Sequence, residues 1–184
     1  MRMNNDISYA LDVVEKIRER VPREDERASD ISIGSVLAAL NSFTDIVRYL
    51  NTRRSTGAIL DLSNEAAVQD ALYLMLRPWI LDLVPETPTE KVANRFSIKD
   101  FASKNGQFVI EAKFVRDVSH GKSLAKEIND DIETYRYHTK CDDLIFFVYD
   151  PNGYIPDSAS LERHVRTNRS YDGKVLRCHG VIKP

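Results

Sequence analysis

Residues 96–115 read FSIKDFASKNGQFVIEAKFV, and this stretch decides the fold. Asn105-Gly106 is the strongest short signal for a β-hairpin, because a tight two-residue turn requires positive φ angles that Asn and Gly adopt readily. Runs of apolar, β-forming residues lie on both sides of the turn. The stretch therefore predicts two antiparallel strands, at residues 96–101 and 107–115.

A two-residue turn also sets which residues face each other. Lys104 then opposes Gln107, and counting back along both strands places Asp100 opposite Glu111. Opposed residues share one face of the pair with Cβ atoms about 5 Å apart, and Lys113 lies on that face too. Two carboxylates so close repel unless a cation lies between them, and a hard divalent metal is the natural candidate. A solvated hairpin face fits the spacing equally well, and a register slip of one residue would turn Asp100 away.

These side chains suit the hydrolysis of a phosphodiester bond. A divalent metal would bind a phosphate oxygen, lower the pKa of a bound water and stabilise the charge that develops on the leaving oxygen. Lys113 would orient the attacking water, help to deprotonate it, or neutralise the scissile phosphate. If the hairpin register holds, the residues indicate a metal-dependent phosphodiesterase.

Helical spacing of apolar residues governs the chain before the hairpin. It predicts a helix at residues 8–20, an exposed connector at 21–30, a second helix from a Ser32 cap to about residue 51, and a third from a Ser63 cap to about residue 77. We expect the first two helices to serve in packing or dimer formation. The prolines at positions 85 and 88 indicate a loop before the hairpin.

Helix and strand patterns alternate after the hairpin. They predict a helix at residues 122–139, a central buried strand at 144–149, a turn at 150–153, a short helix at 158–165 and a final strand at 174–182. Helices followed by the order ββαβαβ predict an α/β (α+β) fold with a mixed sheet. We expect one compact domain, in which residues 1–60 form a helical segment packed on a core of residues 61–184.

Composition excludes several classes of protein. No stretch approaches the roughly 20 apolar residues of a membrane span, and the N-terminal residues carry no apolar leader run, so we expect a cytoplasmic protein. Cys141 and Cys178 form no Cys-x-x-Cys pair and are expected to be buried packing thiols. The net charge of −2 argues against charge-driven coating of nucleic acid, although a local basic patch can suffice. Histidine spacing does not suit zinc, and no Gly-rich phosphate loop or serine nucleophile motif is present.

A family resemblance rests on the hairpin and its surroundings. Asp100, ten intervening residues and then EAK at 111–113 resemble the signature of the PD-(D/E)XK superfamily of restriction-endonuclease-like nucleases, although Lys99 stands where the motif has proline. Over about residues 35–184 the chain is similar to one branch, the small nuclease domains of bacterial restriction and anti-phage defence proteins. The further matching stretches are NEAAVQ at 64–69, FVRD at 114–117, EINDDIETY at 127–135 and LIFFVYDP at 144–151.

The resemblance implies a restriction-endonuclease-like mixed sheet flanked by helices and cleavage of DNA that depends on Mg²⁺, with Mn²⁺ as a substitute. It also implies a homodimer in many members. Whether a defence-system partner protein is needed stays open. Asp100 and Glu111 would be metal ligands, Lys113 the catalytic lysine and Glu65 a helix carboxylate near the metal. Four further residues would line the cleft, namely Gln69, Glu127, Asp131 and Tyr135.

Other readings stay open at this point. Arg116, Lys122 and Lys126 follow the hairpin and are candidates for gripping DNA phosphates, but a solvated helix face fits them equally well. The favoured function is a metal-dependent DNA endonuclease in restriction or anti-phage defence. The alternatives are a catalytically silent DNA-binding or dimerisation module and a metal-dependent ribonuclease, since the same site cuts either backbone.

Overall fold

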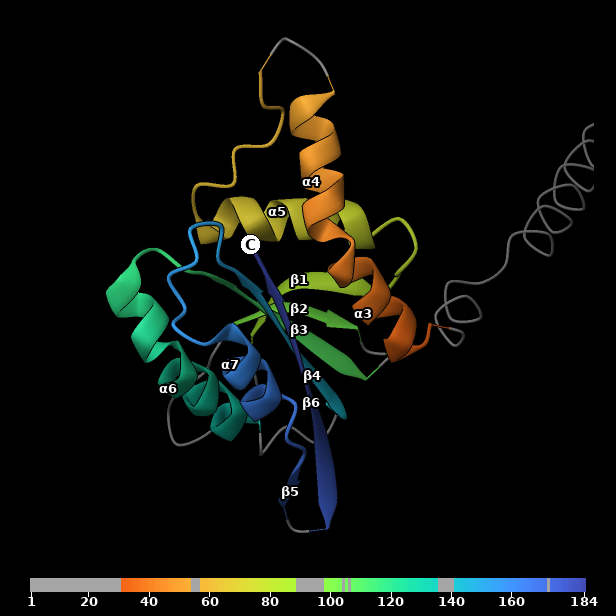
Figure 1. Ribbon diagram of the computed structural model, residues 1–184. Coiled ribbons are helices and arrows are strands. Elements are labelled where there is room, and N and C mark those ends of the chain that lie inside the picture. Colours follow the sequence, from red (N-terminus) through yellow and green to blue (C-terminus); the bar gives the residue numbers. More distant parts are fainter. Residues whose placement is uncertain are drawn as a thin grey trace, which may run out of the picture.

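The computed structural model describes residues 31–53, 57–88, 98–103, 105, 107–135, 141–171 and 173–184. Within these residues, six strands form one mixed sheet in the order β1-β2-β3-β4-β6-β5 (Figure 1). The elements are α3 (Ile33–Asn41), α4 (Phe43–Thr52), α5 (Glu65–Leu76), β1 (Leu83–Pro88), β2 (Ile98–Ser103), β3 (Phe108–Phe114), α6 (Val118–Tyr135), β4 (Asp143–Tyr149), α7 (Ser158–Val165), β5 (Arg169–Tyr171) and β6 (Lys174–Lys183). The predicted fold class is confirmed. The helix predicted at residues 8–20 and the connector at 21–30 lie outside the described residues.

Helices cover both faces of the sheet (Figure 1). One apolar core joins α3 and α5 to Phe101, Ile110 and Phe147, and the other joins α6 and α7 to the opposite face. β3, β4 and β6 are parallel, so the chain must cross over between them, and α6 and α7 lie in these crossovers. The predicted central strand is confirmed, because β4 lies between two parallel neighbours and is buried from residue 143 to residue 148.

The hairpin has the predicted register. Phe101 pairs with Ile110, and Ser103 pairs with Phe108. Asp82 supports the turn, because its carboxylate accepts hydrogen bonds from the Ser103 hydroxyl at 3.0 Å and from the Asn105 amide at 2.8 Å. The chain leading into the hairpin thus holds the turn that aligns β2 with β3.

The single helix predicted between residues 32 and 51 is wrong. Ser32 does cap α3, since its side chain accepts from the Ser35 amide, but the helix ends at Asn41 and α4 follows after Ser42. The side chains of Asn41 and Ser42 donate to the carbonyls of the preceding turn, at 2.9 and 3.1 Å. Such bonds compete with the backbone ladder and favour a break that apolar spacing does not reveal.

Two further expectations are corrected nearer the hairpin. The region of Pro85 and Pro88 is not a loop but strand β1, which tolerates prolines because it is the edge strand of the sheet. The cap of α5 is Asn64 and not Ser63, since the Asn64 side chain accepts from the Ala67 amide at 3.0 Å. In addition, α6 begins at Val118, before the predicted residue 122, and the three-residue edge strand β5 was not predicted at all.

Both cysteines are free and buried, as predicted. Cys141 and Cys178 belong to the core on the α6 side of the sheet. Among the described helices, none combines the length and the apolar character that a membrane crossing requires.

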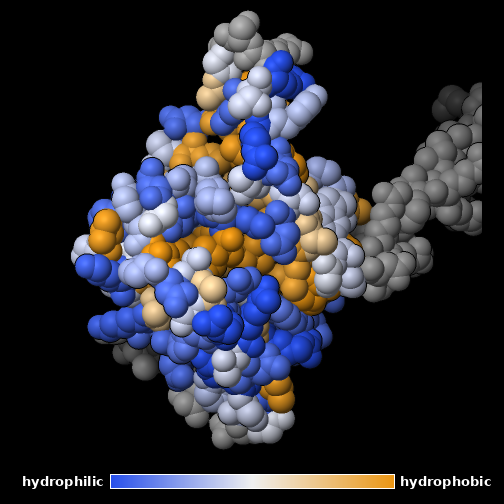
Figure 2. Space-filling view, in the orientation of Figure 1, coloured by the Kyte–Doolittle hydropathy of each residue, from blue (hydrophilic) through white to orange (hydrophobic). Residues whose placement is uncertain are grey.

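An apolar groove opens between α4 and α5. Figure 2 shows apolar surface gathered where the two helices meet. The groove has a volume of about 320 Å³, and Leu74 on its rim is 69% exposed. Its lining is entirely apolar: Phe43, Ile46, Val47, Leu50, Leu60, Ala71, Leu74 and Met75.

The first turn of α6 is fixed against the loop after β4. A Cβ atom on Gly121 would lie 2.3 Å from the carbonyl oxygen of Tyr154, so only glycine fits this contact. The loop in turn is held by Asp150, whose carboxylate accepts from the amides of Tyr154 and Ile155 at 2.8 and 2.9 Å. Two backbone segments therefore touch, and α6 has little freedom to shift along the sheet.

We expect Gly121→Ala to lower the free energy of unfolding by about 1–3 kcal/mol, because the added methyl group must displace backbone atoms. Gly34→Ala is the matched control, since its Cβ would lie 3.7 Å from the Ser32 hydroxyl and meet nothing else within 4 Å. Alanine within a helix is favoured over glycine, so the control should lose no stability. Urea unfolding of both variants measures the difference, and equal stabilities would contradict a fixed contact at Tyr154.

Candidate active site

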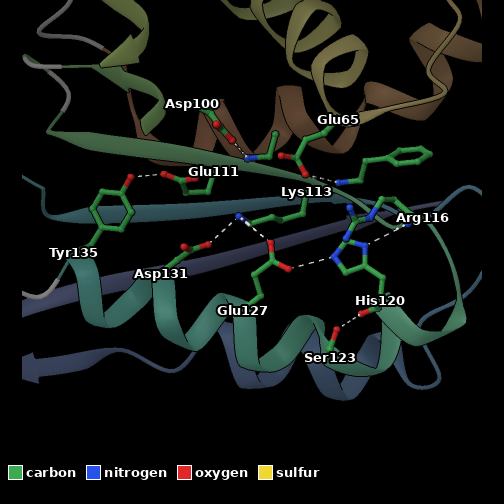
Figure 3. Close-up of polar contacts among 12 residues, drawn as sticks. Glu65, Asp100, Glu111, Lys113, Arg116, His120, Ser123, Glu127, Asp131 and Tyr135 are labelled. Carbon is green, nitrogen blue, oxygen red and sulfur yellow. Dashed lines mark hydrogen bonds and ion pairs between the residues drawn. The ribbon is translucent and has the colours of Figure 1, made fainter. Parts of the chain in front are cut away.

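β3 carries the two central residues of the candidate site. Side chains of a strand alternate between its faces, so Ile110 and Ala112 enter the core under α3 and α5, whereas Glu111 and Lys113 face α6 (Figure 3). Glu111 is only 5% exposed. A carboxylate and an ammonium group are thus placed side by side on a mostly buried sheet face.

Asp100 and Glu65 meet the edge of β3 where its pairing with β2 ends. The paired residues of β3 run from Phe108 to Ile110. Beyond them, the Ala112 amide donates to Asp100 Oδ2 at 2.7 Å, and the Phe114 amide donates to Glu65 Oε2 at 3.3 Å (Figure 3). Two carboxylates therefore take the place of a neighbouring strand at the amides on either side of Lys113, and Glu65 is close enough to Asp100 to affect its pKa.

Burial and mutual repulsion disfavour the charged forms of the carboxylates. Burial raises the pKa of Asp100 to about 6, and the charge of Glu65 adds to the rise, while the Ala112 amide, Lys113 and a hydrogen bond from Gln69 offset part of it. Burial also raises the pKa of Glu111 to about 8, and the next cause is the charge of Asp100. Asp100 is therefore close enough to Glu111 for its charge to raise the cost of ionising Glu111.

Lys113 is held by two carboxylates of α6. Its Nζ lies 2.9 Å from Asp131 Oδ2 and 3.2 Å from Glu127 Oε1 (Figure 3). Burial lowers the pKa of Lys113, but the charges of Asp131, Glu111 and Glu127 outweigh it and leave that pKa above its usual value. Lys113 is therefore a permanent ammonium group, which favours its roles as a cation over the role of accepting a proton from water.

Tyr135 completes the contact between α6 and β3. Its hydroxyl donates to Glu111 Oε1 (Figure 3). Burial and the charge of Glu111 raise the pKa of Tyr135, so the phenol keeps its proton. Because Glu127, Asp131 and Tyr135 are spaced four residues apart, one side of the helix presents all three to β3.

Of the three basic residues predicted to grip DNA, Arg116 follows β3, whereas Lys122 and Lys126 lie one helical turn apart on α6. Arg116 is exposed just after β3 and lines a pocket of about 310 Å³ with Glu65, His120 and Glu127 among its neighbours. Lys122 and Lys126 are exposed on α6, and Lys122 lines a separate groove between α6 and α7. The structure therefore brings Arg116 to the carboxylate cluster but not Lys122.

His120 was missed as a site residue, because sequence reasoning weighed it only as a zinc ligand. It is buried, and its Nε2 lies 3.2 Å from Glu127 Oε2. The spacing of seven residues, two helical turns, places His120 and Glu127 on one side of α6. This spacing could have been read from the sequence only if the helix had been predicted to begin at Val118 and not at residue 122. Asp117 stabilises the true start, because its carboxylate accepts from the His120 amide at 2.8 Å.

Comparison with known protein families agrees with this geometry. The model of the DpnII-MboI restriction endonucleases matches residues 35–178. The chain belongs to the DpnII-MboI restriction endonuclease family. It is therefore an endonuclease that acts on DNA in restriction. Neither the curated proteins nor the solved structures include a match to the chain.

The donor set of this restriction endonuclease fits a magnesium ion. Within the described residues, no three His, Cys, Asp or Glu side chains are gathered so that they could hold a metal by themselves. Mg²⁺ does not require such a cage, because proteins hold it through one or two carboxylates while water and substrate phosphates complete its shell. Asp100 and Glu111 provide hard oxygen donors whose repulsion a cation would relieve.

We expect the stability of this endonuclease to fall as the pH rises in metal-free buffer. The pKa of Glu111 is raised from 4.5 to about 8, so the folded chain binds more protons than the unfolded chain between these values. The contribution of Glu111 to stability should be greatest below pH 4.5, decrease between pH 4.5 and about pH 8, and level off above that pH. Asp100 should also lower stability as the pH rises, over a lower pH range, because its pKa is raised from 3.8 to about 6.

Glu111→Gln tests this dependence, because glutamine can still accept from Tyr135 but cannot ionise. Urea unfolding at a series of pH values should give a flatter profile for the variant. At pH 8 and above, the free energy of unfolding of the variant should exceed that of the wild type by more than about 1 kcal/mol, which corresponds to a pKa shift of about one unit. Parallel profiles would contradict a raised pKa at Glu111.

Proposed function

We propose that this restriction endonuclease hydrolyses DNA phosphodiester bonds with Mg²⁺ bound by Asp100 and Glu111, and that Mn²⁺ substitutes. One observation supports this assignment above the others. The pKa of Glu111 stays raised by burial and by the charge of Asp100 although Lys113 lowers it, and the Lys113 ammonium group is shared with Glu127 and Asp131 at 3.2 and 2.9 Å. Asp100 and Glu111 remain as a repelling buried pair, which is the arrangement that a divalent cation stabilises.

The bound metal would supply an activated water and electrostatic stabilisation of the phosphate. Lys113 remains protonated and places its ammonium group beside Glu111, where it neutralises charge on the scissile phosphate. Tyr135 fixes one oxygen of Glu111, and the Ala112 amide fixes one oxygen of Asp100 at 2.7 Å. Glu65 is the accompanying helix carboxylate, and Gln69 supports Asp100. These contacts preorganise the carboxylates before DNA arrives.

A cleavage assay tests the proposal. Purified protein is incubated with plasmid DNA, linear DNA and RNA in Mg²⁺, Mn²⁺ or chelator, beside Glu111→Ala and Lys113→Ala. We expect cleavage of DNA with either metal and none in chelator. Each variant should lose about 10²–10³-fold in rate, the usual cost of removing one group that stabilises the transition state.

Asp70→Ala is the control, because Asp70 is an exposed carboxylate on α5 and should be dispensable. Full cleavage in chelator, or full activity of Glu111→Ala, would refute the metal assignment. Cleavage of RNA in preference to DNA would favour the ribonuclease alternative. A wild-type protein that binds DNA but cleaves neither DNA nor RNA would favour a catalytically silent module or the need for a defence-system partner.

We also propose that the chain works as a homodimer on invading DNA in the cytoplasm. The resemblance to dimeric nuclease domains motivates the oligomeric state. The groove between α4 and α5 supports it, because exposed contiguous apolar surface marks interaction sites, and Leu74 on its rim is 69% exposed.

Sedimentation velocity tests the dimer. The wild-type chain should sediment as a dimer, and Leu74→Glu should shift it toward the monomer, because a charge would then have to be buried in an apolar contact. Asp130→Ala, which removes an exposed carboxylate from α6 on the opposite face of the sheet, should leave the wild-type distribution unchanged. A monomeric wild type at micromolar concentration would refute this proposal without affecting the assignment of the metal site.

A further inference from the structure

His120 has both ring nitrogens engaged in a buried position. Only 8% of the residue is exposed. The backbone amide of Arg116 donates to Nδ1 at 3.3 Å, and Nε2 lies 3.2 Å from Glu127 Oε2 (Figure 3). Because a backbone amide can only donate, Nδ1 must accept, and the neutral ring therefore carries its hydrogen on Nε2. The hydrogen bonds thus select one tautomer, which donates to Glu127.

Glu127 connects this histidine to Lys113. One carboxylate oxygen faces His120, and the other lies 3.2 Å from Lys113 Nζ. Burial raises the pKa of Glu127, but Lys113 and His120 outweigh it and hold that pKa below its usual value. The carboxylate is therefore charged and bridges the two groups.

Glu127 needs such a fixed partner. Its side chain is 42% exposed, whereas that of Asp131 is 26% exposed, so Glu127 has more open solvent into which it can turn. His120 itself is well fixed, because its amide donates to Asp117 and the next residue, Gly121, touches the backbone of Tyr154. A rigid donor therefore holds a carboxylate that would otherwise be mobile.

We propose that His120 is a positioning residue of the cleavage reaction, which orients Glu127 so that Glu127 and Asp131 together hold the ammonium group of Lys113 beside Glu111. This inference rests on the proposed function of Lys113. His120 acts through Glu127, since within the described part of the chain its ring nitrogens contact Glu127 and the Arg116 amide and not the proposed metal ligands. Residues behind a metal site that orient its catalytic groups commonly matter almost as much as the groups themselves.

Two conservative variants separate the two ring nitrogens. In His120→Gln, the side-chain amide reaches the position of Nε2 and can still donate to Glu127. In His120→Asn, the shorter side chain reaches only the position of Nδ1 and can accept from Arg116. We expect His120→Asn to lower kcat by about 10-fold or more, and His120→Gln to retain most of the activity.

KM and the Kd for DNA should stay within about twofold of wild type in both variants, because His120 orients and does not bind substrate. His164→Gln is the control, since His164 is exposed and contacts Asn129 instead. Equal losses in His120→Gln and His120→Asn, or the reverse order, would overturn the proposal.

A double substitution distinguishes positioning from a general structural role. If His120 acts through Glu127, adding His120→Asn to Glu127→Ala should cause no further loss of kcat, whereas unrelated effects would multiply. Multiplicative losses would refute the pathway through Glu127. Urea unfolding of each variant confirms that the comparison is made between folded proteins.

NMR provides a test that does not depend on cleavage. The ¹⁵N shifts of the His120 ring should show a protonated Nε2 and an unprotonated Nδ1 in the neutral form. The Lys113 ammonium signal should be slow to exchange with water in the wild type and in His120→Gln, and should be lost in His120→Asn. If the wild type cuts no DNA but these signals behave as expected, the proposed function fails while the positioning of Lys113 stands. Identical Lys113 signals in all three proteins would overturn the positioning itself.

Discussion

The separation of β2 from β3 is the constraint on which the candidate site depends. An extended strand cannot leave its backbone amides without partners in a buried environment. Where β2 departs, the amides of Ala112 and Phe114 are satisfied by the side chains of Asp100 and Glu65. The same bonds that complete the sheet edge therefore assemble carboxylates from β2 and α5 beside the one on β3. Architecture and chemistry are coupled here, since a ladder continued along β3 would satisfy these amides with backbone carbonyls and leave the contacts of Asp100 and Glu65 unmade.

The helix α6 fixes the lysine that faces these carboxylates. It contributes Glu127 and Asp131, yet their effect is to keep Lys113 charged and fixed. It also contributes the neutral phenol of Tyr135, which holds Glu111 without adding charge. The contact of Gly121 with Tyr154 sets the position of the helix and hence of these groups. DNA brings further negative charge, so the proposed metal ion would offset the charge of the substrate as well as that of the carboxylates.

The sequence allowed prediction of the parts that depend on short-range pattern. The Asn105-Gly106 turn gave the register of β2 and β3, and the apolar period gave the buried face of α6. The break at Ser42 and the strand containing Pro85 were not predictable in this way, because side-chain bonds to the backbone and position at a sheet edge decided them. His120 was missed because its importance lies in a contact with Glu127, and the helix that aligns them had been started too late. The roles of the site residues remain predictions from pattern and geometry.

The burial of both cysteines has a practical consequence for thiol chemistry. Thiolates and not thiols react with alkylating agents and oxidants. Burial raises the pKa of Cys141 to about 12 and that of Cys178 to about 11, so neither supplies much thiolate near neutral pH. A cysteine introduced at an exposed position would therefore react far faster than the native pair. Fluorophores or spin labels can be attached at one chosen point without first removing the natural thiols, and distances between labelled chains and labelled DNA become accessible in solution.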